Sequence, residues 1–268
     1  MTKIIEEKIN KLEHQDAYRV EELLKDSPYE KTELVYFKGE TGSELGPFIK
    51  KTIKKGGTSI YKQIQQAQKV GMLHEGIPKV VECYDSPEGD ICIMESCEGK
   101  TLEKWIENRE INRYEALVVF RAICEIVNSL HKIQPQIIHR DLKPENILLN
   151  KTTDGFWLYL LDFGIARNPK EGAKNDTVLL GTKEYAAPEQ YGFAQTDQRS
   201  DIYSLGKILY YCLTGNTMET NSTSSYQLTS VIPLEICKVI FKATELDPAK
   251  RYQNVDELLN DLDKANNS

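Results

Sequence analysis

The chain of 268 residues is long enough for one large or two modest domains with a sizeable core. Its composition, 40% hydrophobic and 28% charged, is that of an ordinary folded protein, and the net charge of −7 argues against a nucleic-acid binder. No apolar run reaches the length of a membrane span, and acidic residues follow Met1 too closely for a secretory signal. The six cysteines are scattered without a C-x-x-C pair, which favours reduced thiols in a cytoplasmic protein.

The first residues predict a charged amphipathic helix over 1–14. Its apolar side holds Ile4, Ile5, Ile9 and Leu12. We interpret residues 1–17 as an N-terminal helical extension that pads the following domain, with docking of a partner as the alternative.

A small sheet with one helix is predicted next, up to about residue 94. Strand-like segments occupy 18–24, 32–38 and 47–53, and two more flank a turn at 86–89. The helix is expected after Ser59, because Ile60, Ile64 and Ala67 follow at helical spacing.

The second half is predicted to be mostly helical. Thr101 is expected to cap a short helix that runs through Trp105. Longer amphipathic helices are predicted at 114–131, 202–213, 233–243 and 255–262, and the polar stretch 215–230 is expected to be a loop or a degraded helix.

The most informative stretch is Ile138-His139-Arg140-Asp141-Leu142-Lys143-Pro144-Glu145-Asn146, which Asp162-Phe163-Gly164 follows. Phosphoryl transfer from a magnesium nucleotide needs a base, a cation near the moving phosphoryl group and oxygen ligands for Mg²⁺. These two segments provide all three. They resemble the catalytic and metal-binding loops of protein kinases.

The resemblance implies an α+β, two-lobed protein kinase-like fold, with a small antiparallel-sheet lobe at 18–94 and a hinge and larger, mostly helical lobe at 95–268. A nucleotide is expected in the cleft between the lobes. In this scheme Asp141 is the catalytic base, Lys143 neutralises the transferring phosphoryl group, and Asn146 and Asp162 hold Mg²⁺. His139 is interpreted as a packed structural residue.

Further large-lobe strings strengthen the resemblance. A lysine two residues after the base, here Lys143, resembles the catalytic-loop pattern of the serine/threonine class. The stretch 181–189 resembles the end of a kinase activation segment. The Tyr185–Tyr191 string resembles compact bacterial kinases of the eukaryotic type. The resemblance also implies that Glu189 pairs with Arg251 and that Asp201 braces the catalytic loop.

The small-lobe residues are assigned with alternatives. Lys51 shares a strand face with Ile49 and Ile53 and is chosen over Lys50 as the nucleotide lysine. The kinase family pairs this lysine with a helix glutamate, but no Asp or Glu occurs between residues 44 and 75. Gln66 is the favoured substitute, because Val70 four residues later is expected to pack inward, and Gln65 is the alternative.

The resemblance also assigns the adenine pocket. Met94 lies at its back, backbone groups of Glu95 and Cys97 meet the base, Glu98 reaches the ribose and Leu148 packs beneath the adenine.

The Gly-rich loop of the family is absent, because no glycine precedes Gly39. Pro28 removes an N–H donor, and Glu30 and Glu33 would repel phosphate if they pointed inward. Phosphate affinity is therefore expected to suffer unless the loop folds differently.

The activation segment runs from Asp162 to Glu189, and Thr177 is its best phosphoacceptor. Arg140 resembles the arginine that receives an activation-loop phosphate, so autophosphorylation at Thr177 is a hypothesis.

The sequence thus predicts a serine/threonine protein kinase that uses ATP and Mg²⁺, or Mn²⁺, to phosphorylate a protein hydroxyl. No membrane or nucleic-acid partner is expected. One alternative is a pseudokinase scaffold, which the altered small lobe motivates. A small-molecule kinase of the same fold is a lesser alternative.

Overall fold

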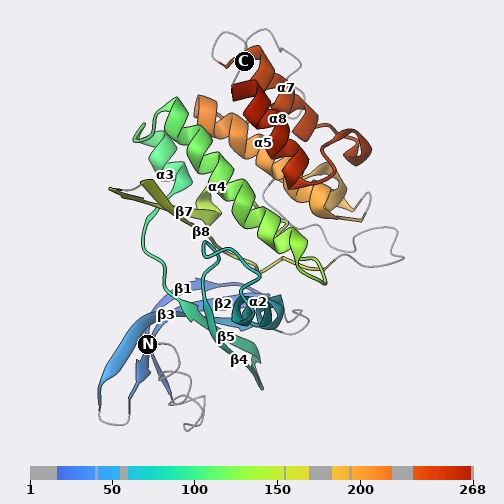
Figure 1. The fold of residues 1–268 in the computed structure, drawn as a ribbon. Coiled ribbons are helices and arrows are strands. Elements are labelled where there is room, and N and C mark those ends of the chain that lie inside the picture. Colours follow the sequence, from blue (N-terminus) through green and yellow to red (C-terminus); the bar gives the residue numbers. More distant parts are fainter. Residues whose placement is uncertain are drawn as a thin grey trace. The chain divides into compact units, whose positions relative to one another are not determined.

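The chain divides into two compact units, which are described separately (Figure 1). The first comprises residues 1–72 and 78–97, and the second comprises 73–77 and 98–268. The computed structural model describes residues 17–39, 42–54, 60–153, 155–168, 183–192, 195–218 and 232–266. The predicted helix at 1–14 and most of the polar stretch 215–230 lie outside the described residues.

The first unit is built on an antiparallel sheet of five strands in the order β1-β2-β3-β5-β4. Its elements are β1 (Tyr18–Asp26), β2 (Glu30–Lys38), β3 (Glu44–Ile53), α2 (Ile60–Lys69), β4 (Val80–Ser86) and β5 (Gly89–Glu95). All five strands and the helix were predicted, and the structure extends several of them by two or three residues. The predicted small antiparallel sheet with one helix is therefore confirmed, in agreement with the α+β class.

Helix α2 buries the face that its periodicity predicts. Its buried residues are Ile60, Tyr61, Ile64 and Ala67. Two glutamine side chains of the helix form hydrogen bonds with the backbone of β4. The side-chain amide of Gln65 donates to the Val81 carbonyl at 2.9 Å, and Gln68 Oε1 accepts from the Val80 N–H at 3.0 Å.

The β4–β5 hairpin requires a glycine. Gly89 has a φ of +141°, and a Cβ there would collide with the Ile53 carbonyl oxygen of the neighbouring strand. Ser86 pairs with Gly89 across the turn, as the Ser-Pro-Glu-Gly signal indicates.

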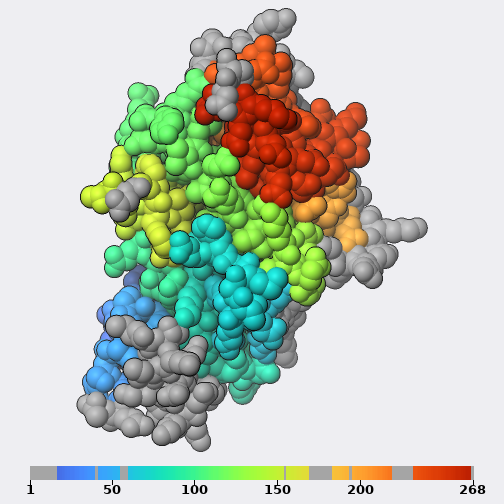
Figure 2. Space-filling model, in the orientation of Figure 1, coloured from blue at the N-terminus to red at the C-terminus, as the bar shows by residue number. Residues whose placement is uncertain are grey.

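The second unit is mainly helical, as predicted. Among the described residues its helices are α3 (Leu102–Glu107), α4 (Arg113–Lys132), α5 (Gln198–Thr214), α7 (Leu234–Ala243) and α8 (Val255–Asn266), with 3₁₀ turns η1 (Pro144–Asn146), η2 (Pro188–Tyr191) and η3 (Pro248–Lys250). Thr101 caps α3, because its side chain accepts the Lys104 N–H. Figure 2 shows α8, in red, on the surface beside α4, in green.

Helix α4 forms the core of the second unit. It begins with a capping box between Asn112 and Glu115, and its buried side includes Phe120, Ile123 and Leu130. Within the part of the chain that the structure describes, no helix is both long and apolar enough to cross a bilayer.

A three-stranded sheet in the second unit was not predicted. It consists of β6 (Lys100–Thr101), β7 (Ile147–Thr152) and β8 (Gly155–Leu160), in that order. These strands have two to six residues, and periodicity cannot separate such short apolar runs from helix. The sheet bears on the candidate site, because Asn146 immediately precedes β7 and Asp162 follows β8.

The predicted pair between Glu189 and Arg251 is confirmed as a buried, bidentate ion pair. Arg251 donates to both carboxylate oxygens of Glu189, at 2.7 and 2.9 Å, and the side chains are 0% and 4% exposed. Ser200 Oγ donates a further bond to Glu189 at 2.7 Å. The remaining guanidinium N–H groups bond backbone carbonyls, including that of Glu245 at 2.7 Å. The charges are thus well satisfied, as burial requires.

We therefore expect Glu189→Gln to lower the free energy of unfolding by roughly 3–5 kcal/mol, because it leaves the Arg251 charge buried without its counter-ion. Lys238→Met breaks the exposed Lys238–Glu235 pair, and it should cost less than about 1 kcal/mol. Urea unfolding of both variants measures the contrast. Equal midpoints would contradict the prediction.

Candidate active site

The loop that carries Asp141 is fixed by one buried carboxylate. Asp201, on α5, is 0% exposed. Its Oδ2 accepts the His139 N–H at 2.9 Å and lies 2.8 Å from His131 Nε2, and its Oδ1 accepts the Arg140 N–H at 2.9 Å. Burial alone would raise the pKa of Asp201, but these hydrogen bonds and the nearby histidines bring it below its usual value. The predicted bracing role is borne out by this geometry.

The same loop pairs with the segment that follows Asp162. Ile138 and Arg167 exchange two backbone hydrogen bonds, at 2.8 and 3.0 Å. Arg140 and Asp162 both have positive φ, at 69° and 61°. Non-glycine residues rarely hold this conformation, and functional loops are where it concentrates.

Three of the four predicted large-lobe residues meet at one point. Lys143 Nζ lies 3.2 Å from Asp141 Oδ2. The Asn146 amide donates to the same oxygen at 3.1 Å and to the Asp141 carbonyl at 2.9 Å. Asp141 and Lys143 side chains are 15% and 21% exposed, so the cluster is sheltered but reachable.

The β7–β8 ladder brings the backbone just before Asp162 beside Asn146. Ile147 pairs with Leu160, and the Leu161 N–H donates to the Asn146 carbonyl at 2.8 Å. The register therefore places Asp162 one residue beyond a direct bond to Asn146. Its carboxylate accepts the Gly164 N–H at 3.3 Å.

The donor set fits Mg²⁺. No group of three His, Cys, Asp or Glu is placed to hold a metal within the described ranges. Mg²⁺ in nucleotide sites usually takes only one or two protein oxygens, and phosphates and water complete its shell. The oxygens of Asn146 and Asp162 meet that need.

His139 is structural, as the sequence interpretation has it. It is 0% exposed, its Nε2 lies 3.0 Å from the Leu161 carbonyl, and its Nδ1 accepts the Asp141 N–H at 3.3 Å. The ring packs edge-on against Phe163 at 4.9 Å. Burial lowers the pKa of His139, so the neutral ring links the loop to the segment around Asp162.

In the first unit, Lys51 points inward and Lys50 is less buried. Lys51 is 6% exposed, and its Nζ lies 3.5 Å from Glu30 Oε1 and 6.0 Å from the centre of the Tyr61 ring. Lys50 Nζ lies 3.9 Å from Glu33 on the opposite face of the sheet. The face argument that favoured Lys51 is consistent with this placement.

The packing argument for Gln66 is wrong. Val70 is 68% exposed, and Gln66 also lies on the exposed side of α2. Gln65 is half-buried and bonds the Val81 carbonyl. A carboxylate does lie near Lys51, but it comes from the sheet: Glu30, expected from the sequence only to repel phosphate, has its Oε1 3.5 Å from Lys51 Nζ.

The β1–β2 turn, where the kinase family has its Gly-rich loop, is held by side chains. Ser27 Oγ accepts the Glu30 N–H at 3.1 Å, and the Ser27 N–H donates to the Glu30 carbonyl at 2.9 Å. Lys54, which directly follows β3, also holds the turn in place. Its N–H donates to the Tyr29 carbonyl, and its Nζ lies 2.5 Å from Asp26. The two carboxylates that were expected to repel phosphate are both paired with lysines. Glu30 lies 2.8 Å from Lys25, and Glu33 lies 2.6 Å from Lys31.

Of the residues assigned to the adenine pocket, Met94 and Glu95 lie on β5 and Leu148 lies on β7, whereas Cys97 and Glu98 lie outside the strands. Met94 is buried opposite Ile49, and the Glu95 N–H donates to the Lys79 carbonyl at 2.9 Å. Burial raises the pKa of Cys97 to about 12, so it remains a thiol. In the second unit Leu148 is half-buried between two buried neighbours of β7, and Glu98 begins the chain segment that leads to α3.

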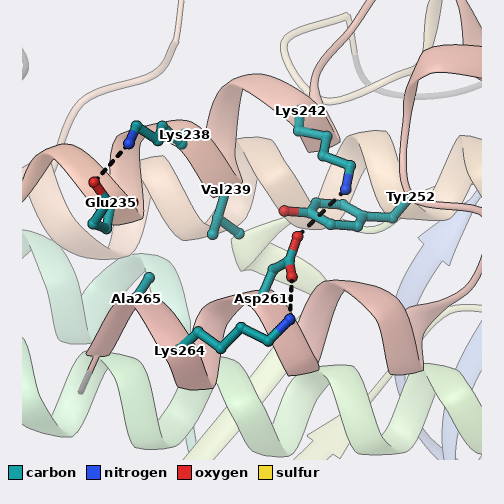
Figure 3. A pocket seen from close by; sticks show the side chains of 8 residues that line it. All are labelled: Glu235, Lys238, Val239, Lys242, Tyr252, Asp261, Lys264 and Ala265. Carbon is teal, nitrogen blue, oxygen red and sulfur yellow. Dashed lines mark hydrogen bonds and ion pairs between the residues drawn. The ribbon is translucent and has the colours of Figure 1, made fainter. Parts of the chain in front are cut away.

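A groove elsewhere in the second unit holds none of these residues. It measures about 270 Å³ and lies between α7 and α8 (Figure 3). Its charges are paired with one another. Asp261 lies 3.3 Å from Lys242 and 3.1 Å from Lys264, and Lys242 also covers the Tyr252 ring at 4.1 Å. The groove therefore offers no cluster suited to catalysis.

The antiparallel sheet of the first unit and the helices of the second are those expected of a two-lobed protein kinase-like fold. The protein kinase domain family matches residues 48–266, and the chain belongs to this family. Serine/threonine-protein kinase pkn2 of Myxococcus xanthus is 31% identical over 215 residues, which cover 73% of this chain and 26% of the relative. Serine/threonine-protein kinase PknB of Mycobacterium tuberculosis is 31% identical over 228 residues, or 76% of this chain and 35% of the relative.

Serine/threonine-protein kinase PrkC of Bacillus subtilis is 31% identical over 207 residues, or 70% of this chain and 31% of the relative. The matches to these three relatives thus cover 26–35% of their length. The expected likeness to bacterial kinases of the eukaryotic type is confirmed.

The buried, neutral state of His139 predicts a pH dependence. The folded-state pKa lies below the usual value near 6.5, so the unfolded chain takes up the proton first as the pH falls. Stability is therefore lost below pH ~6.5, at no more than about 1.4 kcal/mol per pH unit from this residue.

We expect His139→Phe to be less stable than the wild type above pH 7, because two hydrogen bonds are lost, and the gap to narrow as the pH falls toward 5. Chemical denaturation at several pH values measures this. Parallel stability curves would mean that His139 does not titrate differently on unfolding.

Proposed function

We propose that this chain is a serine/threonine protein kinase that transfers the γ-phosphoryl group of ATP to a protein hydroxyl. The observation that carries the proposal is the contact of Lys143 and Asn146 with one oxygen of Asp141, at 3.2 and 3.1 Å. A base, a cation and a metal-binding amide are thus held together on a loop that the buried Asp201 fixes.

Each residue of the cluster has a role in this reaction. Asp141 accepts the proton of the attacking hydroxyl group as it bonds to the γ-phosphorus, and ADP leaves with the β–γ bridging oxygen. Lys143 offsets charge on the group in transfer. Asn146 and Asp162 would hold Mg²⁺, which supplies charge neutralisation at the phosphates.

The nucleotide has further proposed contacts. Lys51 binds its phosphates, and Met94 and Leu148 contact the adenine. Backbone groups of Glu95 and Cys97 bond the base, and Glu98 bonds the ribose. Since the Glu95 N–H already donates to Lys79, its carbonyl is the group proposed to meet the adenine.

The pseudokinase alternative is favoured by one observation, the β1–β2 turn. Pro28 and the Ser27 hydrogen bonds replace the glycines whose N–H groups would approach phosphate. The sheltered contacts of Asp141 argue for chemistry instead. A small-molecule kinase remains the lesser alternative, and transfer to a metabolite but not to protein would favour it.

The domain arrangement and location are proposals as well. Residues 18–94 form the small lobe and 95–268 the hinge and large lobe, with 1–17 as an extension. All six cysteines are free of disulfide bonds, which suits a reducing compartment, so we propose a cytoplasmic location.

Radiolabelled ATP with Mg²⁺ or Mn²⁺ and a generic protein substrate tests the activity. We expect transfer by the wild type, a drop of roughly 10²–10⁴-fold for Asp141→Asn, and none detectable for Asp162→Asn, which weakens the metal site. Lys238→Met, on the surface of α7, is the control and should retain wild-type transfer.

A silent wild type that still shows a nucleotide-induced thermal shift would favour the scaffold and sink the kinase proposal. Equal transfer by wild type and Asp162→Asn would point to a contaminating kinase.

The activation segment suggests a second experiment. Thr177 lies outside the described residues. Arg140 is described. Burial, and after it the charge of Arg140, lowers the pKa of Arg167 to about 10. Two neighbouring guanidinium groups favour an anion, so a phosphate on the segment would relieve their repulsion.

We therefore expect mass spectrometry of protein incubated with Mg-ATP to find phosphate on Thr177, and none on the Asp162→Asn variant. Phosphorylation adds about −1.5 to −2 charges and should raise the melting temperature of the wild type but not of Arg167→Met. An active enzyme with unmodified Thr177 would contradict the hypothesis.

A further inference from the structure

The first unit buries Lys51 on strand β3, and helix α2 of the same unit carries no carboxylate. Lys51 is 6% exposed, and α2, with the sequence Ile-Tyr-Lys-Gln-Ile-Gln-Gln-Ala-Gln-Lys, contains neither Asp nor Glu. A buried ammonium needs a counter-charge, since desolvation otherwise favours its neutral form.

Glu30 provides such a charge from the sheet. It is 6% exposed, and its Oε1 lies 3.5 Å from Lys51 Nζ and 2.8 Å from Lys25 Nζ. In the β2–β3 ladder Thr32 is opposite Lys51 and Glu30 is opposite Ile53. Glu30 and Lys51 are therefore diagonal neighbours on one face of the sheet, a distance that long side chains span.

The backbone at Glu30 is fixed by several bonds. Its N–H and carbonyl are both bonded to Ser27, and the adjacent Tyr29 carbonyl accepts the Lys54 N–H at 2.8 Å. The carboxylate thus extends from a rigid turn rather than from an open loop.

We propose that Glu30 is the positioning residue for Lys51, and that it performs from strand β2 the task that a helix glutamate performs in other kinases. The proposal rests on the proposed function, because it assigns Lys51 to the phosphates of ATP. Glu30 acts through Lys51 and does not itself contact the nucleotide.

The chain provides a matched control in Glu33. It lies on the same strand, is 5% exposed, and its carboxylate is 2.6 Å from Lys31 and 3.9 Å from Lys50. Glu33 and Lys50 lie on the opposite face, because Glu33 is opposite Lys50 in the ladder. Its replacement removes a similarly buried carboxylate without touching Lys51.

The first measurement compares the kinetics of Glu30→Gln, Glu30→Asp and Glu33→Gln with ATP as the varied substrate. A hydrogen bond between charged groups is about twice as strong as one to a neutral partner. Glu30→Gln should therefore lower kcat/KM for ATP about tenfold. Glu30→Asp should recover part of this, and Glu33→Gln should match the wild type.

The second measurement does not require activity. Acetic anhydride at fixed pH modifies neutral amines, and mass spectrometry reads the rate at Lys51. Loss of the neighbouring carboxylate favours the neutral amine, so Lys51 should react faster in Glu30→Gln than in the wild type or Glu33→Gln.

The outcomes separate the two proposals. If the wild type transfers no phosphate but Lys51 reacts faster in Glu30→Gln, the proposed activity fails and the pairing stands. Unchanged labelling of Lys51 overturns the pairing, whatever the activity. Tighter ATP binding or a higher kcat/KM in Glu30→Gln also overturns it, because the carboxylate would then compete with phosphate.

If Glu30→Gln shows no cooperative unfolding transition, Glu30→Asp takes its place in both measurements. Its carboxylate is drawn back by one methylene, so smaller changes in the same direction are expected. Wild-type kinetics and labelling in a folded Glu30→Asp would overturn the proposal.

Discussion

The loop that carries Asp141 depends on a single buried carboxylate. Asp201 lies at 0% exposure on α5 and receives the backbone N–H groups of His139 and Arg140. An unpaired carboxylate at this depth would be strongly disfavoured, so the chain around it has little freedom to move. The positive φ of Arg140 is tolerated because these bonds determine the backbone there. The next residue is Asp141, whose direction is thereby set before its own contacts form.

A second constraint, the ladder between β7 and β8, places Asp162 near Asn146. A one-residue slip would move every side chain of β8 to the other face and carry Asp162 away from the cluster. His139 reinforces the register, because its ring lies 3.0 Å from the Leu161 carbonyl and packs on Phe163. The proposed chemistry of the second unit therefore depends on backbone geometry established by residues to which no catalytic role is assigned.

The sequence predicted the first unit's strands, the main helices and the large-lobe cluster, because periodicity and long motifs report on local structure and on a shared family. It did not predict β6 to β8, whose strands are too short for periodicity. It also misjudged Val70, which is exposed, because helical spacing continues beyond the end of α2 at Lys69. The sequence indicated only that Glu30 could repel phosphate. Its pairing with Lys51 depends on the β2–β3 register, which the sequence alone does not reveal.

The match to the protein kinase domain family begins at Phe48, inside β3, so the first two strands lie outside that match. In this part the charges are balanced by strand neighbours, with Glu30 near Lys25 and Lys51 and Glu33 near Lys31. A pair between strands is fixed by the ladder that joins them, whereas a pair between strand and helix depends on how the helix packs. If Glu30 holds Lys51, its position follows from the register of β2 and β3, and movement of α2 cannot break the pair.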